Sequence, residues 1–145
     1  MITIRQAMVE DYPKVAEFVK SFQQEVIDSF GLWCDDKVLW AIMPKLKDYS
    51  LVMLDDNKVV GVIAGFVTRY HLNNSCIFQE VLFYVKPEYR RYSIKLLKAL
   101  EKKCKDWNIN QVIMAYFGNN GVGKFYEQHG YRFLEAHFIK NLEGG

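Results

Sequence analysis

The chain has 145 residues, of which half are apolar and 15% are aromatic, and its formal net charge is +2. This length fits one domain with a sizeable core, and the apolar content excludes a disordered chain. The near balance of charge does not indicate a nucleic acid or an anionic membrane as partner. We expect a single domain at residues 1–141 and a short tail at 142–145.

The cysteine pattern indicates a reducing compartment. Cys34, Cys76 and Cys104 are an odd set without a CxxC pair, which argues against a disulfide framework and against a zinc site. The segment Met1–Gln6 has no signal-peptide pattern, and no apolar run reaches the length of a membrane span. We therefore expect a cytoplasmic protein with no metal.

Hydrophobic periodicity predicts strands and helices in a mixed order. In chain order the predicted elements are a strand at 2–7, a helix from Asp11 to Val26, a helix from Asp35 or Asp36 to about Pro44, strands at 51–54, 59–67 and 77–85, a helix containing Leu96 to Trp107, a strand at 112–117, a short helix at 122–128 and a last strand at 131–141. The order β-α-α-β-β-β-α-β-α-β predicts a layered α/β fold with a mixed central sheet. The strands at 77–85 and 112–117 should be parallel, because a helix connects them.

A basic bend joins the strand at 77–85 to the long helix. At the start of a helix the first backbone amides lack intrahelical partners, and the helix dipole favours an anion there. Arg90 and Arg91 add positive charge at this bend. The amides expected to be unpaired are those of Arg91, Tyr92, Ser93 and Ile94. This combination suits a pyrophosphate.

The order Val85-x-Pro87-x-Tyr89-Arg90 before a helix resembles the acetyl-CoA site of the GNAT superfamily of N-acetyltransferases. In that family the loop reads Arg/Gln-x-x-Gly-x-Gly/Ala. Arg90 takes its first position, while Ser93 and Lys95 stand where small residues are usual. The resemblance implies the GNAT fold, with its parallel strand pair splayed around coenzyme A. It also implies acetyl-CoA as co-substrate, bound by residues 90–95.

A second motif lies downstream. The segment Asn119-x-x-Val122-x-x-Phe125-Tyr126-Glu127-x-x-Gly130-Tyr131 resembles the family's Asn-x-x-Ala-x-x-Phe/Leu-Tyr-Glu-x-x-Gly-Phe/Tyr. By this resemblance, Tyr126 lies near the coenzyme A sulfur and protonates the leaving thiolate, and Asn119 helps to hold the cofactor arm.

The reaction implied is direct attack of a primary amine on the thioester in a ternary complex. A lysine-like ammonium has a reference pKa of about 10.4, so it must first lose a proton. Glu80, on the strand before the bend, is a candidate base. The backbone of Phe83, Tyr84 and Val85 is expected to pair with the pantetheine arm and to polarise the thioester oxygen.

Other interpretations stay open beside this one. Ser93 and Lys95 favour a catalytically weak or inactive module on the same fold, which binds acyl-CoA or a protein. The run Gly118 to Lys124 fits GxxxxGK, but Phe125 stands where a P-loop needs Ser or Thr.

The acceptor amine, small molecule or protein, is not identifiable from these motifs. In the family that the motifs resemble, the first two helices and the strand-to-strand loops shape the acceptor site. Here this region offers acidic residues for a cation and aromatic residues for an apolar group. They are Glu25, Asp28, Asp35 and Asp36, and Phe30, Trp33, Trp40 and Tyr70. The predicted last strand could also pair between two copies in a homodimer.

Overall fold

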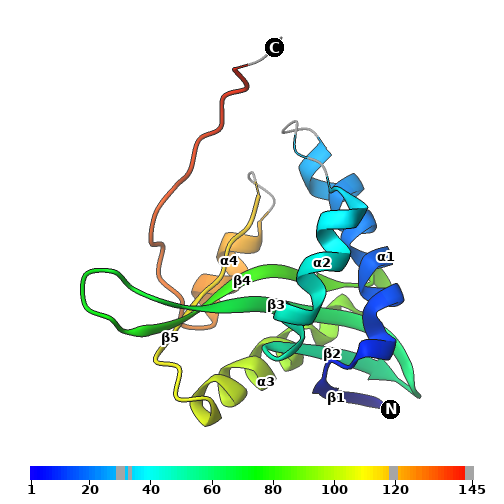
Figure 1. Cartoon of the computed structure of the whole chain (residues 1–145). Helices are drawn as coiled ribbons and strands as arrows, with labels where there is room; N and C mark the ends of the chain where they lie inside the picture. The colour runs from blue at the N-terminus through cyan, green and yellow to red at the C-terminus, as the bar shows by residue number, and fades with distance from the viewer. Residues whose placement is uncertain (29–31, 33, 118–120, 143–145) are drawn as a thin grey trace.

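Four antiparallel strands and one parallel strand form a single sheet. In a computed structural model, which describes residues 1–28, 32, 34–117 and 121–142, the spatial order of the strands is β1-β2-β3-β4-β5 (Figure 1). The first four strands pair antiparallel, and β5 pairs parallel to β4 as predicted. The strand bounds are β1 Ile2–Gln6, β2 Ser50–Asp55, β3 Lys58–Arg69, β4 Cys76–Val85 and β5 Gln111–Ile113.

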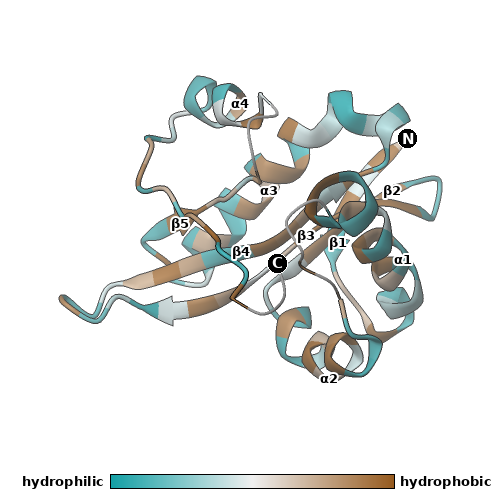
Figure 2. Cartoon of the chain, turned by 90° about the horizontal axis from the view of Figure 1, so that it is seen from above, coloured by the Kyte–Doolittle hydropathy of each residue, from teal (hydrophilic) through white to brown (hydrophobic). Residues whose placement is uncertain are grey.

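Helices cover both faces of this sheet (Figures 1 and 2). On one face lie α1 (Tyr12–Phe22), which continues as a π-helix at Gln23–Ile27, and α2 (Asp36–Lys47). On the other face lie α3 (Ser93–Asp106) and α4 (Val122–Gln128). Short 3₁₀ helices at Val9–Asp11 and Pro87–Tyr92 precede α1 and α3.

The strand β2 shows how the two layers are built. Successive side chains of a strand point to opposite faces. Leu51 and Met53 accordingly pack with the core on the α3 face, while Val52 and Leu54 pack with the core on the α1 face. All four are buried, which is why this strand is a continuous apolar run and not an alternating one.

The second helix begins where the sequence predicts and ends later. The Asp35 carboxylate accepts a hydrogen bond from the Val38 N–H at 3.1 Å, which caps α2. The prediction that this helix stops near Pro44 is wrong, because α2 continues to Lys47. Met43 and Leu46, on either side of the proline, are both buried, and their packing offsets the backbone hydrogen bond that proline removes.

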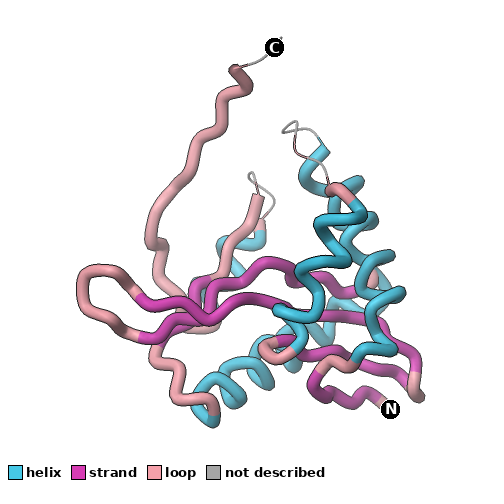
Figure 3. Tube along the Cα trace, viewed as in Figure 1, coloured by secondary structure: helices cyan, strands magenta, loops and turns pink. Residues whose placement is uncertain are grey.

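The predicted last strand at 131–141 is also wrong, and the described element order ends at α4. Residues 131–142 form an extended segment that leaves the body of the molecule (Figures 1 and 3). Its base is anchored, since the Tyr131 N–H bonds to the Tyr126 carbonyl at 3.0 Å and the Tyr131 hydroxyl bonds to Glu101 at 2.8 Å. The strand-like sequence thus has no strand partner within the described part of its own chain.

A β-bulge distorts the centre of the sheet. Ala64 pairs with Leu82 and Gly65 pairs with Glu80, so Val81 is an extra residue on β4. A Cβ atom on Gly65 would fall against the Gln79 carbonyl oxygen and 2.6 Å from Phe78 Cζ. Only glycine therefore allows β3 and β4 to approach this closely at the bulge.

We expect Gly65→Ala to destabilise the protein by about 1–3 kcal/mol, because the added methyl group overpacks this contact. Chemical denaturation measures the change. Thr68→Ala, at an exposed position of the same strand, is the control and should cost less than about 1 kcal/mol. A Gly65→Ala variant as stable as the wild type would contradict the close approach.

Candidate active site

The parallel pair β4 and β5 separates after three residue pairs. The register runs from Ile77–Gln111 to Gln79–Ile113 and stops there, although the sequence predicts a strand up to Phe117. From Glu80 to Val85, β4 has no strand neighbour on this side in the described part of the chain. The separation, which we call the split, leaves a gap in the ladder between the two strands.

The backbone of one residue, Ala115, links two candidate catalytic side chains at the split. The Ala115 N–H donates to Glu80 Oε1 at 3.3 Å, and the Tyr126 hydroxyl donates to the Ala115 carbonyl at 3.4 Å. Glu80 comes from β4 and Tyr126 from α4. The fold thus brings together the two residues that the sequence predicts as catalytic.

The Glu80 carboxyl is in an unfavourable place for a charge. Burial raises its pKa to about 7, and the Ala115 N–H, which stabilises the carboxylate, only partly opposes this. A carboxyl group with this pKa gains and loses its proton near neutral pH, as a general base must.

Tyr126 keeps its proton over a wide pH range. Its side chain is 7% exposed, and its pKa is raised above the ordinary value by burial and by the charge of nearby Glu80. Phe125 and Tyr131 pack against its ring, each with a centroid separation of 5.7 Å. A 3.4 Å hydrogen bond is weak, so the hydroxyl can turn from Ala115 to a better acceptor.

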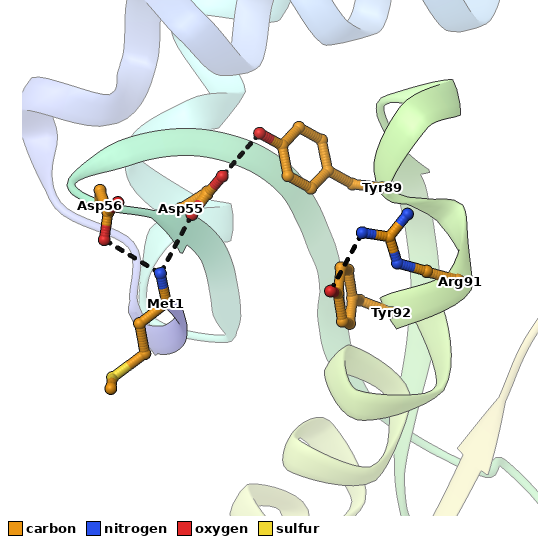
Figure 4. Close-up of polar contacts among 6 residues, drawn as sticks. All are labelled: Met1, Asp55, Asp56, Tyr89, Arg91 and Tyr92. Atoms are coloured by element: carbon orange, nitrogen blue, oxygen red, sulfur yellow. Dashed lines mark hydrogen bonds and ion pairs between the residues drawn. The ribbon is translucent and has the colours of Figure 1, made fainter.

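Two cations gather around one aromatic ring at the start of α3. The Arg91 guanidinium lies 4.6 Å from the Tyr92 ring centroid, and the Lys95 ammonium lies 5.4 Å from it. Arg91 also donates to the Tyr92 hydroxyl at 3.2 Å (Figure 4). Both cations stand beside a helix N-terminus, where an anion is favoured.

The bend before α3 is fastened to the sheet. The Tyr89 hydroxyl donates to Asp55 Oδ2 at 2.7 Å, at the end of β2, and the N-terminal amine also reaches Asp55 at 3.3 Å (Figure 4). Residues 87–92 are a 3₁₀ helix, and the Ser93 N–H donates to the Arg90 carbonyl. The expectation of a free Ser93 amide is therefore wrong, because the 3₁₀ turns use it.

Arg90 faces the opposite layer of the molecule. Its guanidinium donates to Glu25 at 2.8 Å and to the Val85 carbonyl at 2.9 Å, and it lies 5.5 Å from the Tyr84 ring centroid. The Tyr84 hydroxyl donates to the same Glu25 carboxylate at 2.9 Å. In this arrangement Arg90 connects the bend to the π-helix, and it does not stand beside Arg91 and Lys95.

The predicted acceptor residues do not all lie in one place in the structure. Asp35 caps α2, Asp36 forms a 3.8 Å ion pair with Lys20, and Trp40 packs edge-on against Tyr12. Asp28 is exposed in the turn after the π-helix, and Tyr70 lies at the far end of the β3–β4 hairpin against His71. Phe30 and Trp33, and the predicted cofactor residue Asn119, lie outside the described residues.

Comparisons with known proteins identify the family of the chain. A family model described as the acetyltransferase (GNAT) family matches residues 4–131. The chain belongs to the GNAT acetyltransferase family. A comparison with curated protein sequences found no match.

Solved structures share the GNAT fold over nearly the whole chain. A possible acetyltransferase from Clostridium difficile 630 is 24% identical, with 97% of each chain covered and a TM-score of 0.75. A ribosomal-protein-alanine N-acetyltransferase from Brucella melitensis biovar Abortus 2308 is 16% identical, covers 97% of this chain and 99% of its own, and has a TM-score of 0.76. A glucosamine-6-phosphate N-acetyltransferase from Arabidopsis thaliana is 16% identical, with 99% of each chain covered and a TM-score of 0.70.

Two features of this GNAT domain escape sequence reasoning. The Ala115 peptide acts through its backbone, so its residue type carries no signal. The ion pair of Arg90 with Glu25 joins positions 65 residues apart, and no local pattern indicates it.

Neither a metal centre nor a membrane span is found in the described structure. Within residues 1–28, 32, 34–117 and 121–142, no three His, Cys, Asp or Glu side chains are grouped so that they could hold a metal ion. No described helix of the GNAT domain combines the length and the apolar character needed to cross a bilayer.

We expect Glu80→Gln to stabilise the protein at high pH. The folded state keeps the Glu80 proton up to about pH 7, whereas the unfolded chain releases it near pH 4.5, so the free energy of unfolding falls as the pH rises between these values. The loss above pH 7 is about 3 kcal/mol, and the glutamine variant avoids it.

Denaturant unfolding at about pH 5 and about pH 8 measures this difference. Glu127→Gln, at an exposed position on α4, is the matched control and should parallel the wild type. A wild type and a Glu80→Gln variant with the same pH dependence would show that Glu80 is not buried in this way.

Proposed function

We propose that this acetyltransferase, acting in the cytoplasm as its free cysteines suggest, transfers the acetyl group of acetyl-CoA to a primary amine within a ternary complex. The observation that supports this proposal is that Glu80 and Tyr126 both bond to the backbone of Ala115 at the split, one at its N–H and the other at its carbonyl. A base and a proton donor held close together are the groups that aminolysis of a thioester needs.

Each of the two side chains has one task in this reaction. Glu80 removes a proton from the ammonium group, whose reference pKa is about 10.4, and so frees the nitrogen lone pair. The amine nitrogen then attacks the thioester carbonyl carbon, and a C–N bond forms as the C–S bond breaks. Tyr126 gives its proton to the departing sulfur, and the second proton that the nitrogen loses restores the phenol through solvent, so the products are the amide, the coenzyme A thiol and one proton left on Glu80.

The residues at the start of α3 fit a diphosphate. Arg91 and Lys95 supply two positive charges next to the N-terminus of a 14-residue helix. Ser93 has φ −56° and ψ −35°, which any residue adopts, so the glycine usual in this motif is not required by the backbone here. We assign diphosphate binding to residues 91–95, and Arg90 holds the bend in place from the other side.

The open edge of β4 suits the pantetheine arm. Phe83, Tyr84 and Val85 lie on the part of β4 that has no strand neighbour on the β5 side among the described residues. Their backbone groups can pair with the amides of the arm as a further strand would. The Val85 carbonyl already accepts the Arg90 Nε–H, so Phe83 and Tyr84 carry most of this role. Asn119 keeps its predicted role in holding the arm.

We expect Tyr126→Phe to lower kcat by about 10²-fold, because the leaving sulfur loses its proton donor. The KM for acetyl-CoA should change far less, since the phenol acts in the transition state. Thiol release from acetyl-CoA across a panel of primary amines measures both. Tyr116→Phe is the matched control, because this tyrosine is 43% exposed and follows Ala115 directly.

Two outcomes would contradict the proposal in different ways. An unchanged kcat in Tyr126→Phe would remove the tyrosine from the mechanism. If acetyl-CoA raises Tm but no amine is acetylated, the chain is the binding module that Ser93 and Lys95 suggest. If neither acetyl-CoA nor coenzyme A raises Tm while ATP does, the site is not an acetyl-CoA site.

We also propose that the extended C-terminal segment pairs with a second copy of the chain. Large apolar side chains of this segment are exposed: Phe133 by 73%, Leu134 by 66%, Phe138 by 97%, Ile139 by 53% and Leu142 by 86%. The described sheet ends at β5, whose outer edge has unpaired backbone groups. One chain therefore offers both a strand and an edge, and two copies can satisfy each other symmetrically.

We expect the wild type to be a homodimer of the 17.1 kDa chain and Phe133→Asp/Phe138→Asp to be a monomer, because two charges in the interface would be desolvated. Size-exclusion chromatography with light scattering measures the mass. Leu72→Asp, at a 74% exposed leucine in the β3–β4 turn, is the control and should stay dimeric. A monomeric wild type would exclude the pairing.

A further inference from the structure

An apolar cavity lies between the sheet and the two N-terminal helices. Its volume is about 470 Å³, and among the described residues it is lined mainly by apolar side chains of α1, α2 and the sheet. Protein interiors tolerate few voids larger than a water molecule, whereas small-molecule sites commonly measure about 300–1,000 Å³. The cavity is therefore of the size of a binding site and not of a packing defect.

The floor of the cavity is made by a row of small residues. Ser50 on β2 is the register partner of Ala64 on β3, and the larger Leu82 of β4 stands beside Ala64. Ala7 extends the row, since its N–H donates to the Ser50 carbonyl at 2.9 Å. All four residues line the cavity. Small side chains in adjacent strands leave the space that larger ones would fill.

The helices α1 and α2 form the walls of the cavity, opposite the sheet. Ala16, Leu39 and Met43 form a small core cluster of their own between α1 and α2. The two helices therefore pack against each other here, and the small residues of the sheet below them leave the space between helices and sheet unfilled. Val19 and Leu39 line the cavity from the two helices.

The cavity reaches the split. Val81 and Phe117 both line it; Val81 follows Glu80 on β4, and Phe117 lies two residues after Ala115. Successive strand residues normally point to opposite faces, but the bulge at Val81 lets Val81 and Leu82 both face the cavity. Glu80 itself is not among the described lining residues, so a molecule in the cavity places one end between Val81 and Phe117, and its amine must reach Glu80 through the split.

Few polar groups of the lining are free to bind a polar molecule. The polar lining residues are Tyr12, Cys34, Asp35, Lys47 and Ser50. The Ser50 hydroxyl donates to the Leu46 carbonyl at 2.6 Å, the Asp35 carboxylate caps α2, and the Lys47 ammonium lies 3.7 Å from Asp48 Oδ1. A sugar or a polyamine would leave its polar groups unpaired against this lining, which is costly. An alkyl or aryl group would instead gain from leaving water.

From this lining and its continuity with the split, we infer that the acceptor is a primary amine on an apolar body, which fills the cavity while the amine lies at Glu80. The inference rests on the proposed acetyl transfer and names its substrate class. Aliphatic or arylalkyl amines fit, and polar amines of equal length do not.

A series of linear alkylamines, from ethylamine to octylamine, tests the inference through kcat/KM at saturating acetyl-CoA. Each added methylene should raise kcat/KM by about fourfold until the cavity is full. Putrescine, lysine and glucosamine should be far poorer acceptors than hexylamine. If transfer occurs but kcat/KM does not rise with chain length, or if polar amines are preferred, the inference is overturned and the proposed function stands.

Filling the cavity gives the second arm of the test. Ala64→Leu narrows the floor at a residue that is 3% exposed, and Val38→Trp narrows the rim at a residue that is 59% exposed. Each should lower kcat/KM for hexylamine by about tenfold or more and lower kcat/KM for ethylamine far less, because ethylamine fills little of the cavity. Val38→Trp keeps the test valid if Ala64→Leu fails to fold. Val9→Trp, exposed by 64% and outside the lining, is the matched control.

Direct binding separates this inference from the proposed function. Calorimetric titration of N-acetylhexylamine, the expected product, requires no turnover. Binding to the wild type that is lost in Val38→Trp supports the apolar site. If no amine is acetylated in that case, the proposed acetyl transfer is refuted while the apolar site is retained. Absence of binding together with length-independent transfer refutes the apolar site.

Discussion

The early end of the β4–β5 pairing is the constraint on which the site depends. Three residue pairs hold the parallel strands together, and beyond Gln79 and Ile113 they separate. Separated strands leave backbone N–H and C=O groups that need other partners. The N–H and the carbonyl of Ala115 have Glu80 and Tyr126 as partners, so the end of the ladder leaves these backbone groups available to both side chains.

Two poorly exposed carboxyl groups in this protein have pKa values shifted in opposite directions. The direction of the shift distinguishes a structural carboxylate from one that can exchange a proton. Burial alone would raise the pKa of Asp11, but hydrogen bonds from Arg5 and the Met8 N–H lower it overall. Burial raises the pKa of Glu80 to about 7 because one backbone N–H opposes it only in part. Asp11 is stabilised as an anion and fixes a turn, whereas Glu80 is left ready to exchange a proton.

The sequence predicts correctly those elements that short-range interactions along the chain determine. The stripe of Leu96, Leu97 and Leu100 and the cap at Asp35 predicted α3 and the start of α2, because periodicity and capping are local. The motif and the strand position predicted Tyr126 and Glu80 as catalytic residues, and the fold brings both to the backbone of Ala115. The end of β5 and the conformation of residues 131–142 could not be predicted, because strand pairing depends on partners far away in the chain.

The apolar cavity and the bend before α3 are connected at two described places. One is the split; the other is the bridge from Arg90 to Glu25, which joins the bend to the π-helix whose Ile27 lines the cavity. Both side chains of this ion pair are more than a third exposed, so it adds less than about 1 kcal/mol. Its effect is positional: Tyr84, packed on Phe18 of α1 and bonded to the same Glu25, gives the bridge a buried support. The bridge thus connects the bend to the cavity wall through a contact that is weak in energy but fixed in geometry.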